Sequence, residues 1–127
     1  MGEKNSKDLT VLVVEDVEDA RLFMRLELES YGFIVFEAAD GQSAVDVALR
    51  ERPDVILMDL TLPLMDGFEA ARLIRKNQEL KEVPIIAVTA HQETDFRAGA
   101  RDSGFDAYVT KPIEMAWLKE LIDGLLI

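Results

Sequence analysis

Short apolar runs alternate along the chain with segments in which apolar residues recur at helical spacing. Five such runs are predicted as β-strands, at residues 9–14, 34–38, 55–58, 85–88 and 107–109. The first of them is a continuous Leu- and Val-rich run, which is typical of a central strand buried on both faces. The segments that follow the runs are predicted as helices, at residues 17–31, 40–50, 67–76, 94–103 and 114–125.

Turn and capping residues separate these elements. Gly32 and Gly104 are placed to end helices, and Pro53 marks the turn before the third run. Asp40 and Asp66 are predicted to cap the starts of the second and third helices, so Asp66 receives no catalytic role. In the first helix the spacing places five residues on one packed side: Ala20, Phe23, Met24, Leu28 and Tyr31.

A strand-helix unit repeated five times predicts an α/β fold. Its parallel strands would form one doubly wound sheet, with right-handed crossovers and helices on both faces. Ligands of such sheets bind beyond the carboxyl ends of the strands. The 127 residues fit one domain, which we expect to span residues 9–127 after a polar leader at residues 1–8.

Composition excludes several classes of function. With 14 basic and 25 acidic residues, the formal net charge is −11, which disfavours direct contact with nucleic acid or an anionic membrane. The chain has no Cys, so neither disulfides nor a thiolate metal site are available. No apolar run approaches the roughly 20 residues of a membrane span. We therefore expect a cytoplasmic protein.

Residues capable of chemistry follow four of the five predicted strands. Glu15 and Asp16 end the first strand, Asp59 the third, Thr89 the fourth, and Lys111 follows the fifth. If the strand order is 2-1-3-4-5, the four strands are neighbours and these side chains converge.

Three carboxylates brought close together repel one another, so they need a cation or shifted pKa values. Oxygen ligands of this kind suit Mg²⁺, and Mn²⁺ could substitute. Lys111 adds a fixed positive charge and Thr89 a hydroxyl donor. The combination indicates a phosphoryl-transfer site in which Asp59 is the nucleophile.

From residue 10 to residue 125 the chain resembles the receiver domains of two-component response regulators, which have a CheY-like, flavodoxin-like fold with strand order 2-1-3-4-5. Four motifs carry the resemblance, one at each strand end: VLVVED (11–16), ILMDLTLPLMDG (56–67), VTA (88–90) and YVTKP (108–112). Each motif is weak alone, but their order and placement together are specific.

The resemblance implies a role for each matching position. Asp59 would accept phosphate from a sensor histidine kinase or a histidine phosphotransfer protein. Asp16 would ligate Mg²⁺, Glu15 would hold a metal-bound water, and the backbone carbonyl of Thr61 would be a further ligand. Lys111 would bind a phosphoryl oxygen. Glu15 is a small departure from a pair of aspartates, so the outer metal shell could differ.

The resemblance also implies a switch. Thr89 would move to hydrogen-bond the phosphoryl group, and Tyr108 would turn inward into the space that Thr89 leaves. The surface formed by the fourth helix, the fifth strand and the last helix would report this change to a downstream protein, and a phosphorylation-dependent homodimer could form there. The peptide bond between Lys111 and Pro112 is expected to be cis on the same basis.

Several apolar residues leave two interpretations open. Leu22 and Leu26 lie on a different row of the first helix from its packed side, so they either pack against the last helix or form a docking patch for the phosphodonor. Ala20 and Phe23 could belong to that patch. Trp117 is either half-buried or an anchor on the output surface.

His91 is the single histidine and follows Thr89 by two residues. We expect it to do no chemistry of its own, with at most a modest effect on access of water to phosphorylated Asp59.

Three other functions fit the sequence less well. An aspartate-nucleophile phosphatase of the haloacid dehalogenase class would need a carboxylate where Thr61 stands. A flavodoxin-like electron carrier would need a hydroxyl- and glycine-rich loop where the acidic residues 15–18 lie. An interaction module that takes no phosphate would have lost Asp59, Lys111 or the acidic pair Glu15–Asp16, and all are present. We therefore expect a switch that is modified on itself, not an enzyme with external substrates, and either a stand-alone regulator or part of a larger one.

Overall fold

Five parallel strands form one sheet in the order β2-β1-β3-β4-β5, as predicted. The computed structural model describes residues 9–90 and 94–126, and residues 94–97 only as backbone. The leader and His91 lie outside these residues. The strands are β1 (Thr10–Val14), β2 (Ile34–Ala38), β3 (Val55–Asp59), β4 (Ile85–Thr89) and β5 (Ala107–Thr110).

The helices agree with the predicted segments to within one residue at nearly every end. They are α1 (Glu18–Ser30), α2 (Gly41–Glu51), α3 (Gly67–Lys76), α4 (Thr94–Asp102) and α5 (Met115–Leu125). A short 3₁₀ turn, Gln78–Leu80, was not predicted. In the described part of the chain, no helix is long and apolar enough to cross a membrane.

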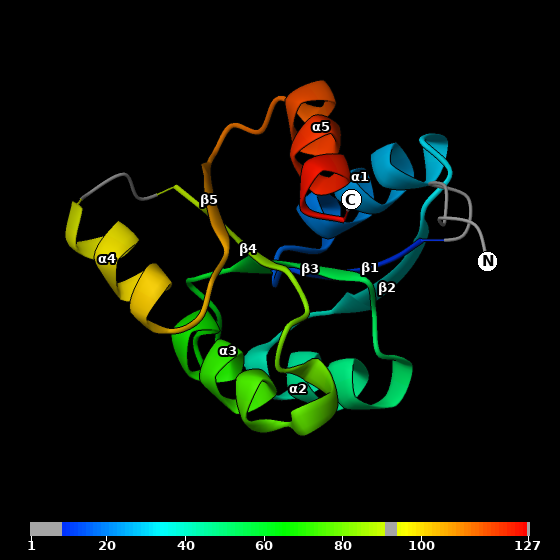
Figure 1. Cartoon of the computed structure of the whole chain (residues 1–127). Coiled ribbons are helices and arrows are strands. Elements are labelled where there is room, and N and C mark those ends of the chain that lie inside the picture. The colour runs from blue at the N-terminus through cyan, green and yellow to red at the C-terminus, as the bar shows by residue number, and fades with distance from the viewer. Residues whose placement is uncertain (1–8, 91–93, 127) are drawn as a thin grey trace.

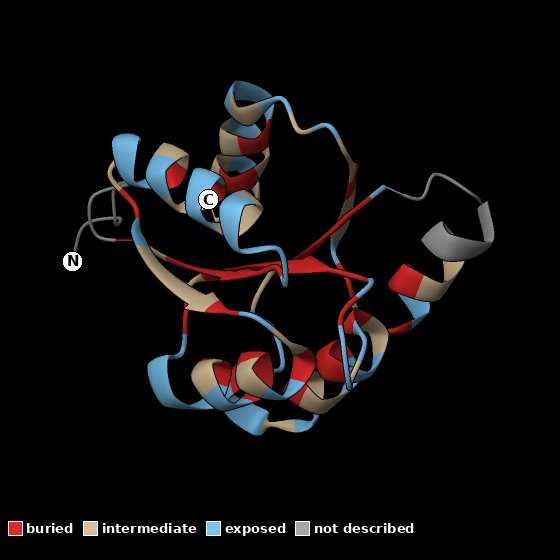
Figure 2. Ribbon diagram, turned by 180° about the vertical axis from the view of Figure 1, so that it is seen from behind, coloured by how far each residue is buried: buried red, intermediate tan, exposed pale blue. Residues whose placement is uncertain are grey.

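The helices cover both faces of the sheet, with α1 and α5 on one face and α2 and α3 on the other (Figure 1). Alternate residues of each central strand enter opposite cores because side chains alternate across a strand. Leu12 and Ile56 pack with α2 and α3, whereas Val11 and Leu57 pack with α1 and α5. The strands at the centre are consequently buried along their length, as Figure 2 shows.

Capping contacts fix the ends of the helices as the sequence predicted. The side chain of Asp40 accepts a hydrogen bond from the backbone N–H of Ser43 at 2.7 Å, and Asp66 accepts one from Glu69 at 2.9 Å. Gly32 and Gly104 have φ values of 99° and 100°, a backbone conformation that favours glycine. The two caps fix where the loops at the carboxyl edge end, whereas the two glycines lie at the opposite edge of the sheet, after α1 and α4.

The prediction for the packed side of α1 was partly wrong. Met24 and Leu28 are buried, but 56% of Phe23 is exposed. Leu22 and Leu26 are also exposed, by 46% and 56%, so the interpretation that they pack against the last helix is wrong. α1 therefore presents more apolar surface than its own packing requires.

Candidate functional site

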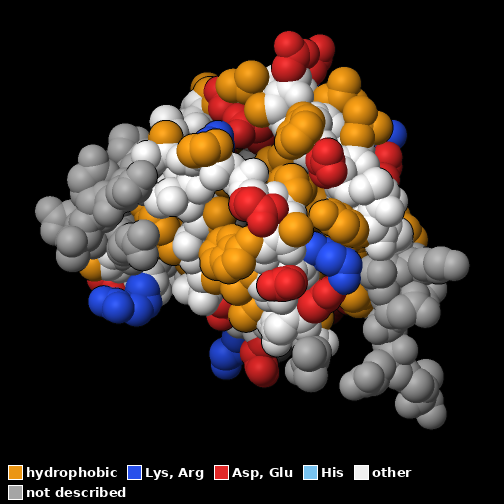
Figure 3. All heavy atoms as spheres, turned by 90° about the horizontal axis from the view of Figure 1, so that it is seen from above, with side chains coloured by type: hydrophobic (Ala, Val, Ile, Leu, Met, Phe, Trp, Pro, Cys, Tyr) orange, Lys and Arg blue, Asp and Glu red, His pale blue; other side chains and the backbone are white. Residues whose placement is uncertain are grey.

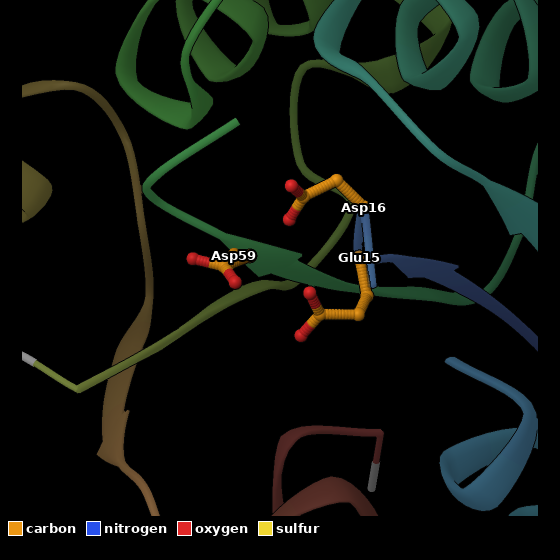
Figure 4. Close-up of side chains that lie close together, drawn as sticks. All are labelled: Glu15, Asp16 and Asp59. Carbon is orange, nitrogen blue, oxygen red and sulfur yellow. The ribbon is translucent and has the colours of Figure 1, made fainter. Parts of the chain in front are cut away.

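Three carboxylates meet at the carboxyl edge of the sheet. Glu15 and Asp16 follow β1, Asp59 ends β3, and one carboxylate oxygen from each lies within 4.8 Å of the others. Glu15 and Asp59 are buried while Asp16 is exposed. In the close-up, the side chains of the three converge on one space between β1 and β3 (Figure 4). The predicted convergence of these residues is confirmed.

Lys111 supplies the positive charge of the cluster. Its Nζ donates to Oε1 of Glu15 at 2.8 Å and to Oδ2 of Asp59 at 3.1 Å. The backbone N–H of Lys111 donates to the carbonyl of Thr89 at 2.8 Å, and the Lys111–Pro112 peptide is cis, as expected. One ammonium group therefore joins two buried carboxylates that are 44 residues apart in sequence.

Backbone groups complete the surroundings of Asp59. Its Oδ1 accepts a hydrogen bond from the N–H of Thr61 at 2.9 Å. Gly67, the first residue of α3, lies against it so closely that a Cβ there would be 2.5 Å from the Asp59 carbonyl oxygen. Gly67 is thus required for more than the turn assigned to it from sequence, since any side chain would displace the strand end that carries Asp59.

Burial and hydrogen bonding move the pKa values of the cluster in different directions. Burial raises the pKa of Asp59 above its ordinary value, against hydrogen bonds from Thr61 and Lys111. Burial also raises the pKa of Glu15, but hydrogen bonds from Lys111 and the Val17 N–H together outweigh it and the pKa is lowered. Asp59 is therefore the less well compensated of the two buried carboxylates.

The pKa of Lys111 follows the same balance. Burial lowers it, but the hydrogen bonds to Glu15 and Asp59 outweigh the burial, so the pKa lies above its ordinary value. Lys111 stays charged at neutral pH and can bind an anionic oxygen.

The donor set fits a hard divalent cation. Three carboxylates share the site, two of them buried, and the cluster contributes only oxygen. Mg²⁺ prefers such ligands, and one ammonium group leaves two of the three negative charges uncompensated. Thr61, proposed as a carbonyl ligand, lies two residues beyond Asp59 in the loop that leaves β3.

The proposed switch residues occupy adjacent strands. Thr89 ends β4 and is buried; Tyr108 is half-buried on β5 and pairs in register with Ala87, two residues before Thr89. Because Ala87 and Thr89 share one face of β4, Tyr108 lies on the same face as Thr89. Tyr108 packs against the core that α2 and α3 cover.

An apolar cavity of about 250 Å³ adjoins the cluster on the α1 side. Its lining comprises Glu15, Ala20, Phe23, Met24, Lys111, Pro112, Ile113 and Met115. Figure 3 views this α1–α5 face, where hydrophobic side chains alternate with acidic ones. Trp117 on α5 is 49% exposed; neither it nor Leu22 nor Leu26 lines the cavity.

Sequence reasoning missed part of this lining. Ile113 lies in the turn between β5 and α5, and Met115 is the first residue of α5, so no pattern singles out either residue as part of a site. Their position directly after the predicted site residue Lys111 is the one signal that could have identified them.

Comparisons with known proteins agree with this geometry. The family model for the response regulator receiver domain matches residues 11–123. The polar-differentiation response regulator DivK of Brucella anthropi is 36% identical over 118 residues, which cover 92% of this chain and 95% of DivK. Protein PilH of Pseudomonas aeruginosa is 37% identical over 117 residues, covering 91% of this chain and 96% of PilH.

Solved structures show the same fold. The receiver domain of a Pseudomonas aeruginosa sensor histidine kinase, crystallised with a magnesium ion coordinated in its active-site cleft, matches with a TM-score of 0.87 and 36% identity, covering 93% of this chain and 97% of that one. Chemotaxis protein CheY4 of Vibrio cholerae matches with a TM-score of 0.89 and 29% identity, covering 93% and 98%. The five-stranded sheet in the order 2-1-3-4-5 is thus the CheY-like fold.

We predict that Asp59→Asn stabilises the metal-free protein at pH 7. An acid whose pKa is raised by folding stabilises the fold when protonated and loses that contribution as pH rises through its folded-state pKa. The amide removes the charge at all pH values, so the thermal midpoint in EDTA should rise by about 2–5 °C, the shift for ~1 kcal/mol. The difference from wild type should shrink as pH falls toward 4. A midpoint lower than that of wild type at pH 7 would contradict the prediction.

Proposed function

The chain belongs to the response regulator receiver domain family, and from that premise we propose that Asp59 accepts a phosphoryl group from a phosphohistidine in two-component signalling. The observation that carries the proposal is the position of Lys111 Nζ, 3.1 Å from Asp59 and 2.8 Å from Glu15, beside three converging carboxylates. A nucleophilic carboxylate and a fixed cation are thereby held at one place.

In the proposed step, a carboxylate oxygen of Asp59 attacks phosphorus in line with the bond to the donor imidazole. The O–P bond forms as the P–N bond breaks, and the imidazole nitrogen keeps the electron pair and takes a proton from solvent. Lys111 is within reach of the incoming phosphoryl oxygens, and Thr89 supplies a hydroxyl donor. Oδ1 of Asp59 already accepts a hydrogen bond from the Thr61 N–H. Oδ2, which accepts a hydrogen bond from Lys111, is therefore the oxygen that we expect to react.

A divalent ion, Mg²⁺ with Mn²⁺ as a possible substitute, would supply positive charge that offsets the phosphoryl oxygens. Asp16 and Asp59 would bind it directly, together with the carbonyl of Thr61, and Glu15 would act from the outer coordination sphere. The outer role of Glu15 rests on the family resemblance; its two oxygens accept hydrogen bonds from Lys111 and from the Val17 N–H.

Loss of the phosphoryl group completes the proposed cycle. Water attacks phosphorus, the bond to Asp59 breaks, and the carboxylate and inorganic phosphate are released. The substrate is the protein's own aspartyl phosphate, so the chain acts as a switch and does not turn over external phosphate esters.

The proposed output passes through Thr89 and Tyr108. When Thr89 donates its hydroxyl to the phosphoryl group, it moves toward the site, and Tyr108, on the same face one strand away, turns into the released space. β5 lies between α4 and α5 in the chain, so this movement changes the α4-β5-α5 surface for a downstream protein. The same surface could form a phosphorylation-dependent homodimer.

The proposed docking site for the phosphodonor is the apolar cavity beside Lys111. A phosphohistidine has to come within bonding distance of Asp59, so the protein that bears it covers the surface next to the cluster. The cavity is continuous with Glu15 and Lys111, and the exposed side chain of Phe23 lies at its lining. We expect a sensor histidine kinase or a histidine phosphotransfer protein to fill it, with Leu22 and Leu26 extending the contact along α1.

The net charge of −11 supports protein partners rather than nucleic acid or an anionic membrane, and we place the protein in the cytoplasm.

Asp59→Asn should abolish phosphorylation because the amide is not a nucleophile toward phosphorus. We expect wild-type protein with acetyl phosphate and Mg²⁺ to gain one phosphoryl group by intact mass, with no gain in EDTA or in Asp59→Asn. Lys111→Ala should label at least tenfold more slowly. Normal labelling of Asp59→Asn would refute the assignment of the acceptor. Turnover of p-nitrophenyl phosphate would refute the proposal that the chain hydrolyses only its own aspartyl phosphate.

Thr89→Ala should be phosphorylated but should transmit the change poorly. The expected result is a normal mass gain, together with NMR shift changes at Tyr108 and α5 reduced to less than half of those in wild type. Thr110→Ala, one strand away in register with Thr89, is the matched control and should respond like wild type. Wild-type shifts at Tyr108 in Thr89→Ala would contradict the proposed route.

Phe23→Ser should slow transfer from a phosphohistidine protein by about tenfold or more, since a buried aromatic anchor is worth at least ~1.4 kcal/mol. Labelling by acetyl phosphate should stay unchanged, because that donor needs no docking surface. Leu49→Ser, an equally drastic change on α2 at a residue that is 40% exposed, is the control. If Phe23→Ser slows phosphorylation equally with both donors, Phe23 acts on the site and not on docking.

A further inference from the structure

Arg21, on the first turn of α1, reaches back to the end of β1. Its guanidinium NH1 donates to the backbone carbonyl of Glu15 at 2.8 Å, and its Nε donates to Oε1 of Glu37 at 3.0 Å. We propose that Arg21 is a positioning residue for the divalent metal site, acting through the peptide that joins Glu15 to Asp16. The inference rests on the proposed function, since it concerns the same metal site.

The carbonyl that Arg21 binds belongs to the last constrained peptide before Asp16. The N–H of Glu15 still donates to Ala38 at 3.1 Å, continuing the ladder between β1 and β2. The side chain of Glu15 is fixed by Lys111 and by the Val17 N–H. Asp16 is exposed, so burial does not hold it. Because a peptide is planar, fixing the carbonyl of Glu15 also fixes the N–H and the Cα of Asp16, from which the Asp16 side chain extends.

Arg21 is itself held rigidly enough for this role. Only 16% of its side chain is exposed, and the fork of the guanidinium binds two acceptors at once, one just after β1 and one on β2. Glu37 on β2 offsets the charge of Arg21. The main effect of the guanidinium is therefore to hold the loop after β1 in a fixed position relative to β2.

Arg25 provides an internal comparison. It lies one helical turn from Arg21 and binds the other oxygen of Glu37 at 2.8 Å, but it also donates to Glu29 on α1, away from the acidic pair. The two arginines therefore share a carboxylate and differ in whether they reach Glu15.

Charge and geometry predict opposite effects of removing Arg21. Loss of a positive charge near three carboxylates strengthens the attraction for a cation. Loss of the hydrogen bond to the Glu15 carbonyl instead lets the Glu15–Asp16 peptide rotate and weakens the binding of the metal. Groups that orient the ligands of a metal typically change its affinity by 10- to 100-fold. The sign of the change thus identifies the mechanism.

The test is calorimetric titration of the metal-free full chain with Mg²⁺, comparing wild type with Arg21→Met, Arg21→Lys and Arg25→Met. We expect Arg21→Met to bind Mg²⁺ at least tenfold more weakly and Arg25→Met to stay within about twofold of wild type. Arg21→Lys keeps the charge but not the fork, so it should also bind more weakly, at least threefold. Thermal midpoints in EDTA should fall in both Met variants, since each loses a contact with Glu37.

Unchanged or tighter Mg²⁺ binding by both Arg21 variants would overturn the inference while leaving the proposed function intact, provided that wild type binds Mg²⁺ and is labelled by acetyl phosphate. Equal weakening in Arg25→Met would also overturn it, because the effect would then arise from Glu37 in general. If Arg21→Met does not fold, the Lys variant decides by itself. Failure of wild type to bind Mg²⁺ would overturn both proposals.

Discussion

The contact of Lys111 with Glu15 and Asp59 is the interaction on which the site depends. Two carboxylates cannot stay buried side by side unless a cation shares their space, because burial removes the water that would otherwise screen them. Lys111 supplies that cation from the residue directly after β5, which lies two positions away from β3 in the sheet. Burial still raises the pKa of Asp59 above its ordinary value, so Lys111 compensates this carboxylate only in part.

The order of the sheet makes that contact possible. β1, β3, β4 and β5 are consecutive neighbours, so their carboxyl ends lie along one edge, and the residues that follow β1, β3 and β5 meet there in one cluster. Gly67 permits the loop after β3 to return against Asp59, and Arg21 ties the loop after β1 to β2. The site is therefore held by backbone contacts on each side, although two of its carboxylates come from adjacent residues of a single loop.

The two faces of the sheet serve different purposes. The α2–α3 face carries the core into which Tyr108 packs, which suits a change transmitted through buried side chains. The α1–α5 face keeps Phe23, Leu22 and Leu26 exposed near a cavity that opens beside Lys111. Apolar side chains left in water next to a reactive group are better explained by a protein that covers them than by packing within this chain.

Local patterns in the sequence determined the elements, the helix caps and the candidate reactive residues, because periodicity, capping and motif spacing depend on neighbours only a few positions apart. They could not decide whether Phe23 and Leu26 are packed, since the width of a helix's buried stripe depends on what lies across from it. They also gave no sign of Arg21 binding the carbonyl of Glu15, or of Ile113 and Met115 lining a cavity. Such contacts join residues from different elements, and only the register of the sheet and the placement of α1 and α5 on it bring them within reach.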